Sequence, residues 1–150
     1  MINEFQGPYR FLSNFYPAQV VVDGLTFPTV EHAYQASKTG DPTLQMRIYV
    51  AESPGEAKRL GRLASRRDLQ DWPRRKEAVM AGLVRQKFDH PALAAKLLET
   101  GDHELLEGNK WGDTFWGVDL VTGLGDNRLG KILMEVRAEL RRKGALHERG

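Results

Sequence analysis

The chain has 150 residues, of which 41% are hydrophobic and 28% are charged, with a formal net charge of +2 and no cysteine. This composition is too apolar for a disordered chain, and the length fits one domain, so we expect a single domain over residues 1–150. The lack of cysteine excludes disulfides, thiolate metal sites and a cysteine nucleophile, and the mild positive charge favours phosphate-bearing ligands over extended nucleic acid.

A β-hairpin and a helix are predicted first along the chain. The Asp-Gly pair at 23–24 separates two β-branched and aromatic runs, which predicts a hairpin over 19–27. Thr29 is then a candidate N-cap for a helix over 30–38. Two further helices are expected over 43–51 and from Pro54, the latter with Ser53 as its cap. Another is expected to begin near Pro73, with Asp71 as a candidate cap, and another to run from Pro91 and end at Gly101. The last is predicted by an apolar stripe at helical spacing: Leu129, Ile132, Leu133, Val136 and Leu140.

The segment 108–130 contains six glycines and no regular period, so we expect a long loop, and loops of this length are usually functional. It carries two tryptophans and two carboxylates, Asp113 and Asp119, within nine residues, so it either folds into the core or forms the wall of a site. Its glycines could let the backbone approach phosphate, or they could serve turns before a helix capped by Asp126 or Asn127. The predicted fold class is α+β, predominantly α-helical, with a small N-terminal sheet.

Generic motifs exclude several reaction classes. The chain has no P-loop, no G-x-G-x-x-G after a strand, no H-E-x-x-H helix and no EF-hand loop, and its four histidines lie in separate segments. We therefore expect no metal. No run of about 18 apolar residues and no signal peptide is recognisable, so we expect a cytoplasmic protein without a membrane partner.

Glu31 becomes the second helical residue if Thr29 caps the helix, and there the helix dipole favours an ionised carboxylate. Such a group could activate water or stabilise a cationic transition state. The alternative is that Glu31, Gln35 and Lys38 form only a solvated helix face. Trp72, between two bunches of basic residues, could stack on a flat base or simply pack at the edge of the core.

Seven segments together resemble the NADAR, or YbiA-like, family. They occur in the order of the family and span nearly the whole chain: "FLSNFYP", "FPTVEHAYQASK", "SPGEAKRLGR", "DW" ahead of "VM" and "KF", "LLETGDHELLE", "DTFWG" and "NRLGKILMEVR". The resemblance implies a mainly helical YbiA-like domain with N-glycosidase chemistry, which needs water but no cofactor.

The resemblance leaves three functions open. The first is hydrolysis of ribosylamino-pyrimidine phosphate intermediates of riboflavin synthesis, with a small ribosylated phosphate as partner. The second is removal of ADP-ribose from guanine in DNA or RNA, and the third is a non-catalytic module that binds ADP-ribose or NAD. The modest net charge favours the small substrate, and the oligomeric state stays open.

The family's catalytic residues fall by motif on Glu31, Trp72 and Asp113. Glu31 would stabilise the sugar cation or activate water, Asp113 would hold the water or a ribose hydroxyl, and Trp72 would stack on the leaving base. His32 is expected only to pack or form hydrogen bonds nearby. Further substrate contacts are expected at Arg10, Asn14, Lys38, Trp116, Gly117 and Asn127. The loop "VDLVTG" is slightly longer than in some members, which leaves any role of Asp119 open.

Overall fold

The computed structural model describes residues 1–149 and is predominantly helical, with two small two-stranded sheets. This confirms the predicted fold class. The contacts within the chain divide it into two compact units, which we call the continuous unit (Asn14–Lys87) and the split unit (Met1–Ser13 with Phe88–Gly150). The expectation of one domain over 1–150 stays a prediction. Within residues 1–149, no helix is both long and apolar enough to cross a bilayer.

The continuous unit begins with the predicted hairpin. Strands β1 (Pro17–Val22) and β2 (Leu25–Thr29) pair antiparallel. The turn residues Asp23 and Gly24 have φ values of 49° and 79°, and positive φ at both central residues is typical of a type I′ hairpin turn. The hairpin is therefore confirmed, and each strand extends two residues beyond the expected 19–27.

A glutamine side chain completes one edge of this hairpin. The Gln86 amide, on helix α5 (Trp72–Lys87), accepts a hydrogen bond from Val21 N at 2.7 Å and donates one to Val21 O at 2.9 Å. Both backbone groups are thus satisfied as they would be by another strand. The same two bonds attach the hairpin to α5.

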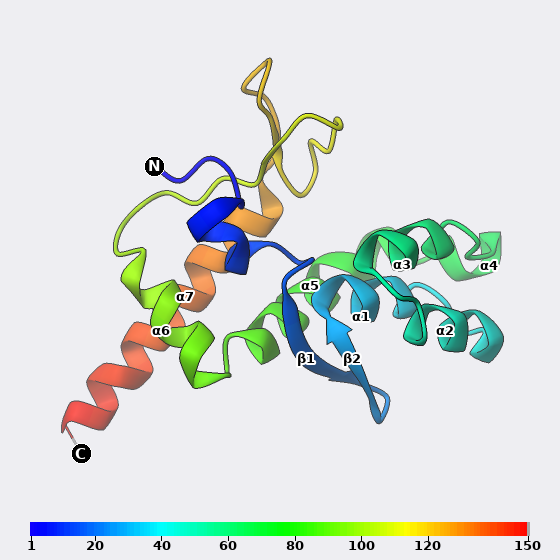
Figure 1. Cartoon of the computed structure of the whole chain (residues 1–150), viewed down its shortest axis with the longest axis horizontal. Helices are drawn as coiled ribbons and strands as arrows, with labels where there is room; N and C mark the ends of the chain where they lie inside the picture. The colour runs from blue at the N-terminus through cyan, green and yellow to red at the C-terminus, as the bar shows by residue number, and fades with distance from the viewer. Residues whose placement is uncertain (150) are drawn as a thin grey trace. The chain divides into compact units, whose positions relative to one another are not determined.

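Helix α1 (Val30–Ala36) lies at the centre of the continuous unit, and all seven of its residues are buried. It ends two residues before the expected 38, where the N–H groups of Lys38 and Thr39 donate to carbonyls only three residues back. The chain then turns away, and Thr39 Oγ1 and Gly40 N donate hydrogen bonds to Asp68 at 2.7 and 3.2 Å. The elements packed against α1 are the hairpin, α5, α2 (Pro42–Tyr49) and α3 (Pro54–Gly61) (Figure 1).

The helix caps of this unit are set by short polar side chains. Ser53 Oγ accepts a hydrogen bond from Glu56 N at 3.1 Å, which confirms the expected cap of α3. A helix that sequence reasoning missed, α4 (Arg66–Leu69), is only one turn long. It is fixed by a capping box in which the Ser65 and Asp68 side chains each accept a hydrogen bond from the other residue's backbone N–H.

The split unit is built on η1 (Gly7–Leu12), α6 (Pro91–Glu99) and α7 (Arg128–Arg149), and α6 packs against the other two (Figure 1). Gly101, with a φ of 63°, follows the end of α6 as expected. The expected stripe of α7 is buried at Leu129, Ile132, Leu133 and Val136 and partly exposed at Leu140.

The long loop of the split unit contains a short element that the sequence does not predict. Strands β3 (Gly108–Asn109) and β4 (Val118–Asp119) pair in parallel over two residues each. The rest of segment 108–130 is held by backbone–backbone bonds, such as Asp126 N to Thr114 O at 2.7 Å, and by side chains bonded to backbone, as described below.

Lys87, at the end of α5, provides a test of the core of the fold. Its side chain is 1% exposed, its ammonium lies 5.8 Å from the centroid of the Tyr16 ring, and burial lowers its pKa to about 7. The folded state therefore binds fewer protons than the unfolded state between about pH 7 and the ordinary lysine pKa near 10.4, so this group makes stability rise with pH in that window.

We expect Lys87→Met to be more stable than the parent below about pH 7, by at most about 5 kcal/mol, with an advantage that shrinks toward pH 10. Urea unfolding of both proteins from pH 6 to 10 measures this difference. A difference in unfolding free energy that stays constant across the range would contradict the burial of an ionisable ammonium.

Candidate active site

The start of α1 is fixed by its cap. Thr29 has extended backbone angles, and its Oγ1 accepts a hydrogen bond from His32 N at 3.0 Å, which confirms the expected N-cap. Glu31 is then the second helical residue, and its own N–H donates to Asn14 O at 3.1 Å. The carboxylate of Glu31 thus lies at the positive end of the helix dipole, which favours its ionised form.

His32 has both ring nitrogens in hydrogen bonds, Nδ1 to Thr29 Oγ1 at 2.8 Å and Nε2 to Ala51 O at 3.0 Å. Because a carbonyl oxygen can only accept, Nε2 carries the hydrogen, and in the neutral ring Nδ1 accepts from the Thr29 hydroxyl. His32 therefore joins the cap of α1 to the chain ahead of α3. It is a hydrogen-bonded neighbour of Glu31, as expected.

Glu31 and Gln35 are not part of a solvated face. They are 7% and 3% exposed, and Gln35 Nε2 donates to Glu31 Oε1 at 2.9 Å. The solvated alternative is therefore wrong for these two residues, because α2, α3, α5 and the hairpin surround α1. A buried carboxylate stays charged only where hydrogen bonds and nearby charges offset its lost hydration, and the helix start and Gln35 supply both.

Lys38 is partly buried and lies in a positive environment. Burial lowers its pKa most, Glu31 acts in the opposite direction, and the charges of Lys58, Lys76 and Arg62 lower the pKa further. Its Nζ lies 5.4 Å from the centroid of the Tyr34 ring. The positive charges of Lys58, Lys76 and Arg62 would attract an anion toward Lys38, so this end of α1 can suit a phosphate.

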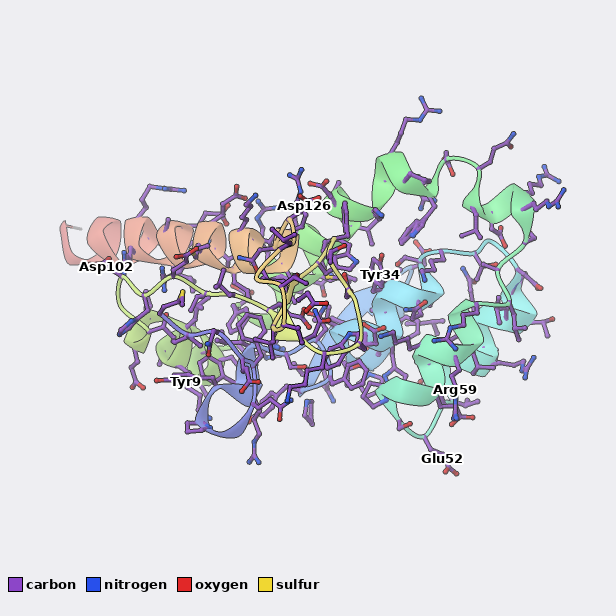
Figure 2. The ribbon with its side chains drawn as sticks, turned by 90° about the horizontal axis from the view of Figure 1, so that it is seen from above. Tyr9, Tyr34, Glu52, Arg59, Asp102 and Asp126 are labelled. Carbon is purple, nitrogen blue, oxygen red and sulfur yellow. The ribbon has the colours of Figure 1, made fainter. Side chains whose placement is uncertain are left out.

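Trp72 is 6% exposed, and its ring packs in the continuous unit. Its centroid lies 5.2 Å from that of Tyr34, the labelled ring on α1 in Figure 2, and the Arg75 guanidinium lies 5.5 Å from the Trp72 centroid. These contacts are those of an aromatic residue at the edge of a core. Stacking of Trp72 on a leaving base stays a prediction.

A cleft of about 680 Å³ lies beside Lys38 in the continuous unit, between the hairpin turn, the end of α1, α4 and α5. Neither Glu31 nor Trp72 lines it. Its ionisable lining residues balance in charge: Lys38, Arg67 and Arg75 against Asp23, Asp68 and Asp71. Hydrogen bonds, chiefly from Thr39, lower the pKa of Asp68 to about 2, so this carboxylate stays charged. Its negative charge offsets part of the attraction of the cleft for an anion.

Asp113 organises the long loop of the split unit. Its Oδ1 accepts hydrogen bonds from Phe115 N at 3.1 Å and Trp116 N at 2.9 Å. Its other oxygen, Oδ2, has no hydrogen-bond partner in the described part of the chain. One half of the carboxylate therefore fixes the turn, and the other half can accept from a ligand.

Asn109 holds Asp113 in place, and sequence reasoning missed it. The side chain is 1% exposed, its Oδ1 accepts from Asp113 N at 3.0 Å, and its Nδ2 donates to Asp113 O at 2.9 Å and to Glu107 Oε2 at 3.0 Å. A buried amide with this many partners rigidifies the segment around it. The only sequence signal was an asparagine next to the first glycine of the glycine-rich segment.

Gly117 and Asn127 also hold the loop together. A Cβ at Gly117 would lie 1.9 Å from Glu107 Oε2 and 2.1 Å from Glu107 O, so no side chain fits there. Asn127 Oδ1 accepts from Glu107 N at 3.0 Å, and Asn127 Nδ2 donates to Leu105 O at 2.9 Å. The Asn127 side chain thus bonds to the backbone ahead of the loop, while the backbone carbonyl of Asn127 accepts a hydrogen bond from Lys131 N at 3.0 Å at the start of α7. Substrate contacts at both residues stay predictions.

The remaining predicted contacts differ in exposure. Asn14 lies beside Glu31 and its Nδ2 contacts Met80 Sδ at 3.5 Å. Arg10 is exposed on η1, and the partly exposed Trp116 ring packs edge-to-face on Phe115, with centroids 4.8 Å apart. The structure thus gathers Asn14, Glu31 and Lys38 around α1 in the continuous unit, with Trp72 on Tyr34, and gathers Asp113, Trp116, Gly117 and Asn127 in the loop of the split unit.

A metal site does not emerge from this geometry. Among residues 1–149, no cluster of three or more histidine, aspartate or glutamate side chains is placed to hold an ion. The expectation of a reaction without metal or organic cofactor stays a prediction.

Comparison with known proteins agrees with the resemblance seen in the sequence. The sequence model of the NADAR domain family matches residues 2–141. The N-glycosidase YbiA of Escherichia coli (strain K12) is 41% identical over 133 residues, which are 88% of this chain and 82% of that protein. An N-glycosidase of Nostoc punctiforme is 41% identical over 138 residues, 89% of this chain and 87% of its own.

A riboflavin biosynthesis protein of Vibrio vulnificus is 45% identical over 133 residues. These are 88% of this chain but only 36% of that relative, so the chain spans about a third of its length. The NMR structure of the E. coli protein YbiA superposes with a TM-score of 0.80 at 36% identity, over 97% of this chain and 89% of the other.

The cap of α1 can be tested by removing one hydroxyl. In Thr29→Val the cap and the bond to the His32 ring are lost, and we expect the unfolding free energy to fall by about 1–2 kcal/mol. Thr26→Val, an exposed position of the same strand, is the matched control and should be nearly neutral. Equal loss in both variants, measured by urea unfolding, would show that the cap contributes nothing.

Proposed function

Since this chain belongs to the NADAR domain family, we propose that it is an N-glycosidase that hydrolyses the bond between a ribose-type sugar and a nitrogen atom. The observation that carries the proposal is the buried carboxylate of Glu31, held at the start of α1 by its backbone and by Gln35. The names of two relatives that match over most of both chains support the same reaction class.

The chemistry requires a negative group beside the sugar. As the bond between C1 and nitrogen breaks, its electron pair leaves with the nitrogen and the sugar becomes an oxocarbenium-like cation. Water then bonds to C1 and gives up a proton, while the leaving nitrogen gains one. Glu31 would stabilise the cation or accept the proton from water, and its burial strengthens either effect because little solvent screens it.

The substrate we propose is a ribosylated compound that carries a phosphate, most simply a ribosylamino-pyrimidine phosphate of riboflavin synthesis. The cations around Lys38 support the phosphate, since an added anion would offset the repulsion and burial that lower the pKa of Lys38. The name of the Vibrio relative supports the pathway. In this proposal Lys38 and Arg10 bind phosphate, Asn14 orients the ribose or Glu31, and Trp72 and Trp116 contact the base.

Asp113 would hold the attacking water or a ribose hydroxyl. Its Oδ1 already accepts hydrogen bonds from two backbone N–H groups, so Oδ2 is the atom that would accept a hydrogen bond from the water or the hydroxyl. Gly117 and Asn127 would act close by, by keeping the loop in this shape.

We expect Glu31→Gln to lower turnover by about 100-fold or more, since positioned electrostatic stabilisation typically has this magnitude. Glutamine preserves the shape of the side chain and can still accept the bond from Gln35, so the fold should be retained. Glu99→Gln, an exposed position at the end of α6, is the control and should keep full activity. Full turnover in Glu31→Gln would eliminate the proposed role of this carboxylate.

The same assay identifies the substrate. Purified protein is offered a ribosylamino-pyrimidine phosphate and an ADP-ribosylated guanine oligonucleotide in parallel, and the released base is followed by mass spectrometry. Cleavage of the pyrimidine compound is the expected result. Cleavage of only the oligonucleotide would replace the substrate with ADP-ribosyl guanine, and cleavage of neither would favour a non-catalytic binding module.

Asp113 can be separated from its structural role by comparing two substitutions. Asparagine can still accept both backbone N–H bonds, so Asp113→Asn should keep the thermal stability and lose activity by about tenfold or more. Asp113→Ala should lose both. Asp119→Asn is the matched control, since Asp119 Oδ1 also accepts from two backbone N–H groups, of Val121 and Thr122. Equal activity in the two asparagine variants would contradict a special role for Asp113.

A further inference from the structure

We propose that Gln35 is a positioning residue for Glu31, and that position 61 is glycine because the amide of Gln35 needs that space. The proposal rests on the catalytic role of Glu31 proposed above. It adds two residues, one on α1 and one on α3, that control the orientation and charge of the carboxylate without contacting substrate.

Gln35 follows Glu31 by one helical turn, so the two side chains lie on the same face of α1. Gln35 Nε2 donates to Glu31 Oε1 at 2.9 Å. The amide must have this orientation, because the reverse would set its oxygen against a carboxylate oxygen. A hydrogen bond donated to a carboxylate favours the ionised form and fixes the direction of its free lone pairs.

The oxygen of the Gln35 amide, Oε1, is a buried acceptor without a hydrogen bond within the described part of the chain, which costs free energy. Buried acceptors are almost always bonded, so an exception requires an explanation. We infer that the bond from Nε2 to Glu31 fixes the amide. Oε1 must then face away from Glu31, even though no donor lies there among the described residues.

Gly61, the last residue of α3, lies on that opposite side. A Cβ at Gly61 would be 1.8 Å from Gln35 Oε1, 2.7 Å from Gln35 Cδ and 3.3 Å from Gln35 Cβ. The backbone of Gly61 is not in the left-handed region, so the conformation itself does not require glycine. Alanine would favour the helix more. The space taken by the Gln35 amide is therefore the reason for glycine, and the Gly61 Cα–H supplies at most a weak donor to Oε1.

Helices α1 and α3 thus act together on Glu31: the open space at Gly61 allows the position of the Gln35 amide, and the amide orients the Glu31 carboxylate. Moving the amide by the length of a methyl group would break the bond to Glu31. The carboxylate would then lose a hydrogen bond that favours its ionised form and limits its rotation.

The first test is Gln35→Met, which keeps the length and volume of the side chain and removes the donor. We expect kcat to fall by about tenfold with KM nearly unchanged, and the acidic limb of the kcat profile to move up by about half a pH unit or more. A residue that only fills space would change thermal stability without moving this limb. An unchanged kcat and pH profile in Gln35→Met would overturn the proposal.

The second test is a double-mutant cycle. Gly61→Ala should reproduce the lowered kcat and the shifted acidic limb, because the new methyl group displaces the Gln35 amide. In a Gln35→Ala background the same change should have little further effect on kcat, since the amide is gone and the remaining Cβ contact of 3.3 Å needs only a small adjustment. Equal effects in both backgrounds would show that Gly61 does not act through Gln35.

Gly82→Ala is the matched control, because Gly82 is also helical and a Cβ there meets nothing within 4 Å. It should leave kcat and its pH profile unchanged. If Gly61→Ala does not fold, the Gln35→Met profile decides alone. If Glu31→Gln keeps its turnover, the proposed function fails; if Glu31→Gln is inactive while Gln35→Met has the profile of the parent, only the positioning of Glu31 by Gln35 fails.

Discussion

The N-terminus of α1 is the constraint on which the continuous unit depends. Thr29 is the last residue of β2 and the cap of α1, and the His32 ring joins this cap to Ala51. Because every residue of α1 is buried, rotation of the helix about its axis would separate His32 and other buried polar groups from their hydrogen-bond partners. Cap and core together therefore permit one orientation, and that orientation fixes the direction of Glu31.

Burial of the Glu31 carboxylate costs free energy, and it also strengthens the electrostatic effect of this group on its surroundings. Removing a carboxylate from water costs free energy unless hydrogen bonds and charges compensate, and here the helix start, Gln35 and the charge of Lys38 supply the compensation. These groups are already in place before any ligand binds, so they need no reorganisation when a positive charge develops nearby. The same arrangement that allows a buried charge therefore also suits it to stabilise a cation.

The local features of the continuous unit could be predicted from the sequence, and the burial of its polar residues could not. The hairpin turn and the caps Thr29 and Ser53 depend on residues within a few positions of one another. The solvated face expected as an alternative for Glu31 and Gln35 was wrong because helix packing decides exposure. Gly61 looks like an ordinary glycine near a helix end until the Gln35 amide is seen against it. The fold class followed from local signals, and the proposal that Glu31 is the catalytic carboxylate needed the family motif.

Two glycines of the long loop, Gly125 and Gly130, also have a packing explanation. A Cβ at Gly125 would lie 2.2 Å from Gly117 O, and one at Gly130 would lie 2.1 Å from Leu105 O. At both positions the backbone of another segment, and not a phosphate, lies where a side chain would be. The amide of Asn109 and the carboxylate of Asp113 then replace the missing regular structure with bonds to backbone. A loop held in this way can be rigid without being a helix or a strand. Its chemical capacity therefore resides in the atoms that this scaffold leaves over, above all Oδ2 of Asp113.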